Sequence, residues 1–250
     1  MIIVIQCCSR KKQNAGSFII NNRQTVRFVA EPDLCQESDQ EYFCKPDDLV
    51  PGSHNTWREH LQQYNEIYHR TGDNPYNLCT AIELYRPKGR IYRALVDTFG
   101  EENTFILSAG WGLVGISILL PDYDITFSKS AKNVGICRVR SITDNSWNDF
   151  NHLKNDHISE NEVIYFFGGL VYHHQFYKLM TNIPNQKVIY YNSQNYINHT
   201  DTSYRFERYH LANGLRTNWH YQCAKDFMHQ RETCEAKFTT SERESLDDRK

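Results

Sequence analysis

The sequence predicts an α/β fold, with a single domain over residues 1–230 and a largely parallel or mixed central sheet flanked by helices. Apolar runs typical of buried strands lie at 2–6, 104–108, 163–167 and 187–192. Segments with helical spacing separate these runs, and this alternation favours parallel strands joined by helices. A chain of 250 residues is also long enough to bury one large core.

The segments between the runs predict the remaining elements. We expect helices from Trp57 with Asn55 as the cap, over 77–99 with an interruption at Pro87-Lys88-Gly89, and over 144–156, 171–182 and 211–230. Residues 25–30 alternate like a further strand. The acidic segment 31–53 holds three Pro and no periodic apolar pattern, so we expect a loop or lid there. The polar segment 231–250 is expected to form a frayed tail.

The composition excludes several classes of protein. With 40% hydrophobic and 23% charged residues, the chain is not of a disordered type. No apolar run approaches the roughly 18–20 residues of a membrane span, so we expect no membrane partner. A formal net charge of -2 excludes a protein that is basic overall, though not a local basic groove. The 8 Cys contain no C-x-x-C pair, so we expect reduced thiols, a cytoplasmic location, no metal and no cofactor.

Ligands of open α/β sheets usually bind at the carboxyl ends of the strands. The first strand ends in Ser9, Arg10, Lys11 and Lys12. A hydroxyl followed by three cations can cradle a phosphate or another anion. A solvated basic loop is the alternative interpretation.

The strand at 104–108 opens into a glycine-rich segment that begins at Ser108. The small residues Ala109, Gly110 and Gly112 would let the backbone approach a ligand closely, and Trp111 would offer it a flat face.

Asp122 and Asp124, on either side of Tyr123, follow this segment. Their spacing suits a strand or loop that directs both carboxylates to one side. Two close carboxylates have pKa values that are pushed apart, which is useful for activating water. The alternative is a Pro-Asp turn in which Asp124 caps the next segment.

Two further strand ends carry candidate binding residues. Gly168 and Gly169 precede a helix, as at anion-binding helix N-termini, although a tight strand–helix connection also needs Gly. Asn192 and Gln194 lie between Tyr191 and Tyr196 after the last strand, where aromatic rings could stack a base and amides could bind its edge. An ordinary polar loop is the alternative there.

Four motifs occur in a fixed order along the chain. They are Cys8-Ser9-Arg10-Lys11-Lys12, then Leu107-Ser108-Ala109-Gly110-Trp111-Gly112-Leu113-Val114, then Tyr123-Asp124-Ile125-Thr126, and finally Gly168-Gly169 with Tyr172 just after. In this order they resemble the YaaA/DUF6884-type superfamily, whose members show C-S-x-K-K, L-S-A-K-x-G-L-[LV] and P-Y-D-x-T. The resemblance covers roughly residues 1–12 and 80–180.

The chain departs from the family pattern at two positions. Gly110 replaces the usual Lys, which removes a cation and makes room for a bulkier substrate. Asp122 replaces the usual Pro and adds a carboxylate. The resemblance implies a link to DNA, because one branch is described as a DNA-binding peroxide-stress protein and the wider superfamily is associated with DNA-base modification. The chain is also similar in character to phage-defence DNA glycosylases.

We therefore expect a DNA glycosylase that removes a modified base, such as a hydroxymethylated or glucosylated one, for example in anti-phage defence. The oxocarbenium-like sugar of that reaction needs a carboxylate, for which Asp124 is the first choice and Asp122 the second. The flipped base would stack on Trp111 or Tyr123, and its edge would be bound by Asn192 and Gln194. The substrate site would be completed by Ser108, Gly110, Gly168, Gly169 and Tyr172. The phosphates would be held by Ser9, Arg10, Lys11 and Lys12.

Two other functions fit the same residues. A non-catalytic DNA-binding protein would use the basic loop and the last helix, with Arg216, Lys225 and Arg231, against the DNA backbone. A nucleotide or nucleoside hydrolase or transferase would act on small molecules, and the near-neutral charge favours this function.

Overall fold

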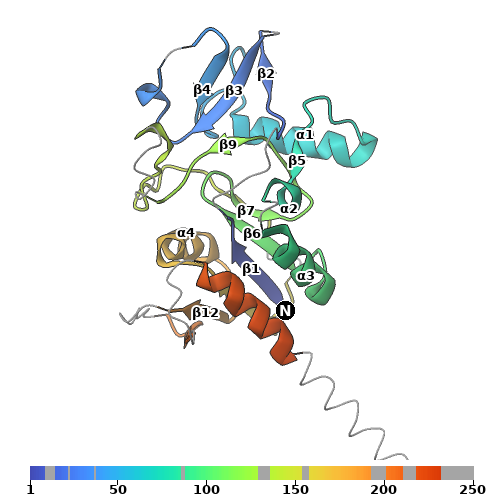
Figure 1. Ribbon diagram of the computed structural model, residues 1–250, viewed down its shortest axis with the longest axis vertical. Helices are drawn as coiled ribbons and strands as arrows, with labels where there is room; N and C mark the ends of the chain where they lie inside the picture. The colour runs from blue at the N-terminus through green and yellow to red at the C-terminus, as the bar shows by residue number, and fades with distance from the viewer. Residues whose placement is uncertain are drawn as a thin grey trace, which may run out of the picture.

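The computed structural model describes residues 1–8, 15–21, 23–36, 38–85, 88–128, 136–153, 158–192, 201–210 and 218–231. The described chain contains a seven-stranded sheet in the order β10-β7-β6-β1-β11-β12-β13 (Figure 1). The strands are β1 (Ile2–Gln6), β6 (Thr104–Ser108), β7 (Gly112–Gly115), β10 (Phe150–Asn151), β11 (Ile164–Phe167), β12 (Lys187–Tyr191) and β13 (Tyr204–Arg208).

The predicted α/β fold with a mostly parallel central sheet is confirmed. Strands β6, β1, β11, β12 and β13 run parallel to one another. Within this sheet β7 pairs antiparallel with its neighbour β6, and β10 then runs parallel to β7. The four predicted strands match β1, β6, β11 and β12 within one residue, because each is a continuous apolar run buried on both faces.

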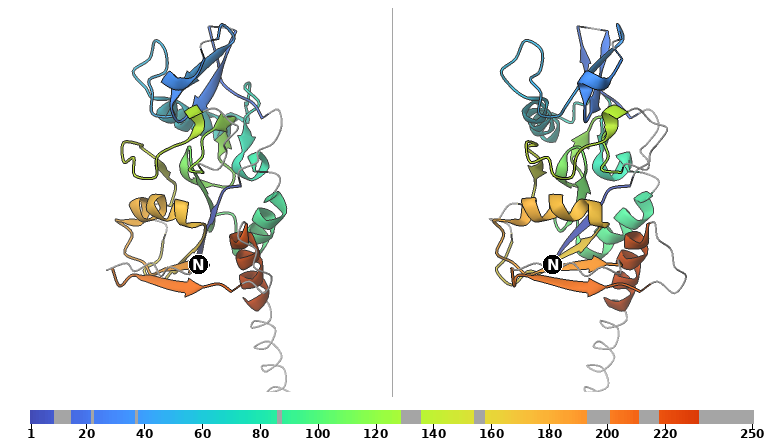
Figure 2. Two further views of the ribbon diagram at one scale, coloured as in Figure 1. Left: turned by 60° about the vertical axis from the view of Figure 1, so that its left-hand side comes forward. Right: turned by 90° about the vertical axis from the view of Figure 1, so that its left-hand side faces the viewer.

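Helices cover both faces of this sheet (Figure 2). Phe166 of β11 stacks on Phe176 of α4 (Leu170–Met180), with the ring centroids 4.3 Å apart. The neighbouring Tyr165 and Phe167 point to the other face and contact Phe227 of the helix at 219–231. This alternation along one strand places two helices on opposite sides of the sheet.

The predicted helices are found at most places, with shifted ends. Helix α1 (Trp57–Thr71) begins with a capping box of Thr56 and Glu59, so Thr56 rather than Asn55 is the cap. Gly72, with a φ of 76°, ends it. The segment predicted as helical over 77–99 contains β5 (Cys79–Thr80), α2 (Ala81–Leu84) and α3 (Gly89–Phe99). Of the helix predicted over 211–230, the described part is helical from 219 and continues to 231, and residues 211–217 lie outside the described residues.

Most of the described residues over 31–53 form the expected loop, but two short elements interrupt it. The segment contains the 3₁₀ helix η1 (Pro32–Leu34) and β4 (Glu41–Cys44). Strand β4 runs parallel to β3 (Gln24–Val29). These two strands form a second sheet with β2 (Ile19–Ile20) and β9 (Tyr123–Asp124). Figure 1 shows this second sheet beyond the upper end of the central sheet. Three of its four residues are only partly buried, so backbone pairing rather than an apolar run defines this strand.

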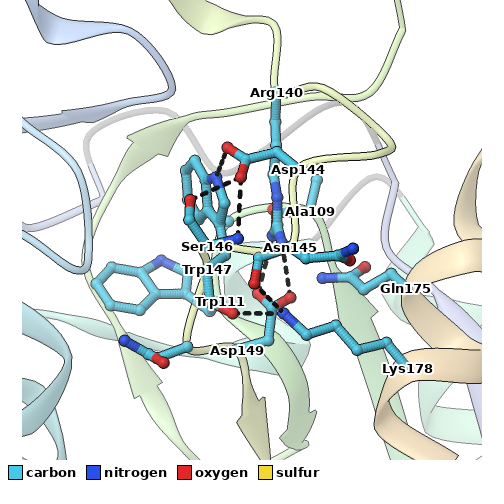
Figure 3. A network of polar contacts seen from close by, with 12 residues as sticks. Ala109, Trp111, Arg140, Asp144, Asn145, Ser146, Trp147, Asp149, Gln175 and Lys178 are labelled. Atoms are coloured by element: carbon cyan, nitrogen blue, oxygen red, sulfur yellow. Dashed lines mark hydrogen bonds and ion pairs between the residues drawn. The ribbon is translucent and has the colours of Figure 1, made fainter.

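The helix expected over 144–156 is also wrong within its described part. Residues 141–149 form turns and extended chain, and β10 follows. The Asp144 carboxylate accepts hydrogen bonds from the backbone N–H and hydroxyl of Ser146 and from the indole N–H of Trp147. Such local bonds compete with helix formation. Lys178 of α4 donates to the carbonyls of Asn145 and Trp147, as Figure 3 shows.

A buried ion-pair network fixes the turn between β6 and β7. Arg140 donates to the Ala109 carbonyl and forms a double ion pair with Asp149, whose side chain is fully buried (Figure 3). Arg58 of α1 donates to the carbonyls of Trp111 and Gly110. It also pairs with Asp47 at 2.7 Å and lies 3.9 Å from Asp149. Both guanidinium groups are therefore removed from water, and the carboxylates of Asp149 and Asp47 compensate their charge.

We expect the substitution Asp149→Asn to lower the free energy of unfolding by about 3–5 kcal/mol, because it leaves Arg140 buried without its counter-charge. Urea unfolding followed by circular dichroism would measure the change. Glu41→Gln is the matched control, since its pair with Arg27 lies at the surface and is worth about 1 kcal/mol at most. Equal losses in the two variants would contradict the central role of the network.

Candidate functional site

The sheet order creates a crevice between β1 and β11. From β1 the chain continues toward β6 on one side, whereas from β11 it continues through α4 to β12 on the other side. At such a reversal the connections diverge and leave a crevice at the carboxyl ends of the strands. A cavity of ≈ 600 Å³ lies there. It is lined by Gln6 at the end of β1, by Cys7 and Cys8 just after it, by Gly169 after β11 and by Asn192 after β12. This volume is within the usual range for small-molecule sites.

Side-chain hydrogen bonds fix the floor of this cavity. The Gln6 side-chain oxygen accepts from the backbone N–H of Gly169 at 2.7 Å, which joins the ends of β1 and β11. The Tyr172 hydroxyl lies 3.3 Å from the Cys7 sulfur. Two more hydroxyls, of Tyr92 and Tyr221, donate to the Gln6 carbonyl. The polar backbone at the strand ends is thus satisfied by the protein itself.

Asp124 contributes a carboxylate to the wall of the cavity. It ends the short strand β9, and its side chain is 49% exposed. The guanidinium of Arg138, from the 3₁₀ helix η3 (Ile136–Arg138), binds it at 2.8 Å. Asp122 does not line the cavity and lies 3.8 Å from Arg27 instead. Each carboxylate thus pairs with a different arginine, and of the two candidates only Asp124 lies at the site.

The segment from Ser108 to Trp111 supports the site from inside the core and does not line it. Ser108 is fully buried, and its hydroxyl bonds to the Tyr123 hydroxyl at 2.9 Å and accepts from the backbone N–H of Trp111. Trp111 is also fully buried, stacked on Phe150. The prediction that it stacks a ligand is therefore wrong, because core side chains already cover its ring.

Gly110 makes room for a protein side chain. A Cβ at this position would lie 3.0 Å from the ring of Tyr123, so the missing side chain allows that ring to pack against the backbone. The expected space for a bulkier substrate is therefore filled. Gly168 has the same role for Phe166, whose ring would lie 2.3 Å from an added Cβ. Neither glycine lines the cavity.

The other predicted residues divide into two groups. Tyr123, Gly169, Tyr172 and Asn192 line the cavity, as expected from their positions at strand ends. Ser9, Arg10, Lys11, Lys12 and Gln194 lie outside the described residues, as does the tail over 232–250. Cys8, the last described residue before the basic segment, lines the cavity.

The structure adds residues that the sequence analysis missed. Arg138, His173, Trp219 and His220 all line the cavity. Trp219 and His220 begin the last helix, more than 200 residues after β1, so no local spacing could place them beside it. His173 follows Tyr172 directly, and a buried helix face next to a Gly-Gly turn was a usable signal for it.

Burial keeps the titratable groups of the cavity floor uncharged. It lowers the pKa of His173 to about 4, against a smaller opposing effect of the Gly168 backbone. It also lowers the pKa of His220 to about 3, and the charge of Lys88 acts in the same direction. Burial raises the pKa of Tyr123 and Tyr172 well above the usual value. At neutral pH the floor therefore consists of neutral imidazoles and phenols, and among the described lining residues Asp124 and Arg138 carry the charge.

A second cavity, of ≈ 1190 Å³, lies at the amino ends of β1 and β6, beside Ile2 and Asn103. It contains none of the predicted site residues. Across the described ranges, no group of three or more His, Cys, Asp or Glu side chains is placed to hold a metal ion. No helix in the described part of the chain is both long enough and apolar enough to cross a membrane.

No protein-family profile, no curated protein and no solved structure matches the chain. The assignment of function therefore depends on the geometry of the cavity and on the sequence motifs.

We expect the stability of the protein to fall between pH 7.5 and pH 5, partly through His173. The pKa of this imidazole is about 4 in the folded protein, against an ordinary value of 6.5, so the unfolded chain binds the proton first as the pH falls. The contribution, on the order of 3 kcal/mol in full, is present above pH 6.5 and is lost toward pH 4. Urea unfolding of His173→Gln should show a smaller pH dependence, by about 2 kcal/mol between the two pH values. The exposed neighbour variant His174→Gln should behave as wild type, and an unchanged slope in His173→Gln would exclude the assignment.

Proposed function

We propose that the protein is a DNA glycosylase, which hydrolyses the bond between a base and its deoxyribose. One observation supports this above the others: a half-exposed carboxylate, Asp124, lies in the wall of a cavity at the carboxyl ends of parallel strands. The resemblance of the sequence motifs to a superfamily associated with DNA bases favours DNA as the substrate. Active sites of α/β folds are usual at this position.

In the proposed reaction, water replaces the base at C1′ of the sugar. As the C1′–N bond breaks, positive charge develops on the sugar, and the Asp124 carboxylate stabilises it. The electron pair of the broken bond leaves with the base, which takes up a proton, and the oxygen of water bonds to C1′ after losing one. Water and substrate thus supply all atoms of the products, a free base and an abasic sugar.

The cavity has the features that a flipped base requires. Tyr172 and Trp219 provide aromatic walls, and Trp219 is held by stacking on Tyr209 at 6.2 Å. The Asn192 side chain offers an amide for the base edge. Aromatic walls with a few polar groups are typical of pockets that take a base out of the stack.

Arg138 has a positioning role in this proposal. Its bond to Asp124 holds the carboxylate in one orientation, and it keeps a positive charge beside the substrate. The segment Ser9, Arg10, Lys11 and Lys12 would bind the flanking phosphates, since it continues from Cys8 at the cavity.

We expect Asp124→Asn to reduce base release by at least about 100-fold, because the amide cannot stabilise the developing positive charge. The measurement is an incubation with normal DNA and with phage DNA that carries hydroxymethylated or glucosylated bases. Mass spectrometry would detect the released base, and alkaline cleavage would detect abasic sites. Asp122→Asn is the matched control two residues away and should keep activity within about twofold. Full activity in Asp124→Asn would exclude a catalytic role for this carboxylate.

A nucleotide or nucleoside hydrolase is the second candidate. It is favoured by the charge of the cavity, where Arg138 is the only Lys or Arg side chain among the described lining residues and is already paired with Asp124. Release of base from mononucleotides but not from DNA would identify this activity. Retention of DNA with a steep salt dependence, and no base release from any substrate, would instead indicate the non-catalytic DNA-binding function.

A further inference from the structure

Two cysteines that lie far apart in the sequence meet beside the proposed site. Cys35 ends the 3₁₀ helix η1, and Cys137 lies in η3, which packs against η1. The backbone N–H of Glu31 donates to the Cys137 carbonyl at 2.7 Å, and the Cys35 sulfur lies 4.0 Å from the Glu31 carbonyl oxygen. The two thiols are also hydrogen-bonded to each other. Residues so distant along the chain meet only through the fold.

Both thiols are within reach of solvent. Across the described ranges, Cys35 and Cys137 are half-buried, whereas the other cysteines are buried. The buried ones are Cys7, Cys8, Cys44, Cys79 and Cys223. Two neighbouring thiols that solvent reaches can react with an oxidant and then with each other.

The surroundings of the pair give the two thiols different roles. Burial raises the pKa of the Cys35 thiol to about 12, and the Cys137 thiol and the carboxylates of Asp124 and Glu41 act in the same direction. Cys35 is therefore protonated at neutral pH, and its S–H group can donate to the Cys137 sulfur. The thiolate is the form that attacks a disulfide, so Cys137 is the thiol that reacts first and Cys35 is the one that follows.

We infer that Cys35 and Cys137 form a site of reversible oxidation, at which a small disulfide such as oxidised glutathione causes the two sulfur atoms to bond. Cys137 attacks one sulfur of the oxidised glutathione, which gives a mixed disulfide and releases one reduced glutathione. Cys35 then attacks the Cys137 sulfur and displaces the second reduced glutathione. The two thiol protons pass to the released glutathiones, so the protein is oxidised by two electrons and the oxidant is reduced by two.

The position of the pair couples its oxidation to the proposed site. Arg138 follows Cys137 directly and binds Asp124 at 2.8 Å. A disulfide holds its sulfur atoms about 2.0 Å apart, closer than any hydrogen bond, so the segments that carry the two cysteines must draw together when it forms. The contact between Arg138 and Asp124 changes with this movement. Only this consequence rests on the proposed function; the thiol pair itself does not.

The test follows the thiols by mass spectrometry in the full chain with Cys234→Ser, which removes the one cysteine outside the described residues. After incubation with oxidised glutathione, the intact protein should lose two hydrogen atoms, and a peptide map should join the segments that hold Cys35 and Cys137. Dithiothreitol should reverse the change. Cys44 is the internal control, since it is buried and should stay unmodified.

Single variants in the same chain test the order of attack. Cys35→Ser should stop at the mixed disulfide and keep one glutathione on Cys137. Cys137→Ser leaves only the protonated thiol of Cys35 at this site and should take up glutathione at least about tenfold more slowly. The inference is overturned if the folded protein forms no disulfide, or if the disulfide joins any other pair of cysteines.

A separate assay tests the coupling to base release. We expect the oxidised protein to release base at least about tenfold more slowly than the reduced protein, because a displacement of about 1 Å at a catalytic site can cost about 100-fold in rate. The variant with both Cys35→Ser and Cys137→Ser should be insensitive to the oxidant. A disulfide without any effect on base release would reject the coupling. Base release that is absent in both states would reject only the glycosylase, because the mass measurement decides on the thiol pair.

Discussion

Two buried arginines, Arg58 and Arg140, hold the turn after β6 by its carbonyl oxygens, and the site depends on this contact. Together they bind three successive carbonyls, of residues 109–111, while Asp149 and Asp47 compensate their charge. The turn so fixed presents Gly110 to the ring of Tyr123, whose hydroxyl bonds to Ser108. Since Asp124 is the next residue, the ion pairs in the core determine where the proposed catalytic carboxylate lies.

Buried polar groups are held by two different kinds of contact in this protein. Around the turn, both charged guanidinium groups lie against carboxylates and carbonyls, which compensates much of their desolvation. Around the cavity, aromatic packing holds His173 and His220 in place, and each keeps a buried nitrogen without a partner among the described residues. Such a group costs about 1–3 kcal/mol. Buried atoms without a partner among the described residues also occur around the turn, at Nε of Arg140 and Nε1 of Trp111.

The sequence predicts the elements whose signal is local. The runs 2–6 and 104–108 are apolar on both faces, so they identify β1 and β6 and the parallel sheet. The expected helix over 144–156 fails because the side chain of Asp144 forms its own turn with Ser146 and Trp147. Only the part of the site that lies next to strand ends can be predicted from the sequence. Strand ends place Gly169 and Asn192 correctly, but His220 reaches the cavity through the last helix, which no spacing near β1 reveals.

The aromatic content of the chain also follows from this arrangement. Tyr85, Tyr92, Tyr123 and Tyr172 are buried beneath the cavity, and burial raises the pKa of each hydroxyl well above its usual value. Their hydroxyls bond to Gln6, Cys7, Ser108 and one another, so they satisfy the ends of the strands without bringing in charge. Among the described lining residues, Asp124 and Arg138 form the charged pair beside these neutral phenols. A sugar that becomes positive there would meet the Asp124 carboxylate, which Arg138 holds in one orientation, and this is the physical basis on which Asp124 can act.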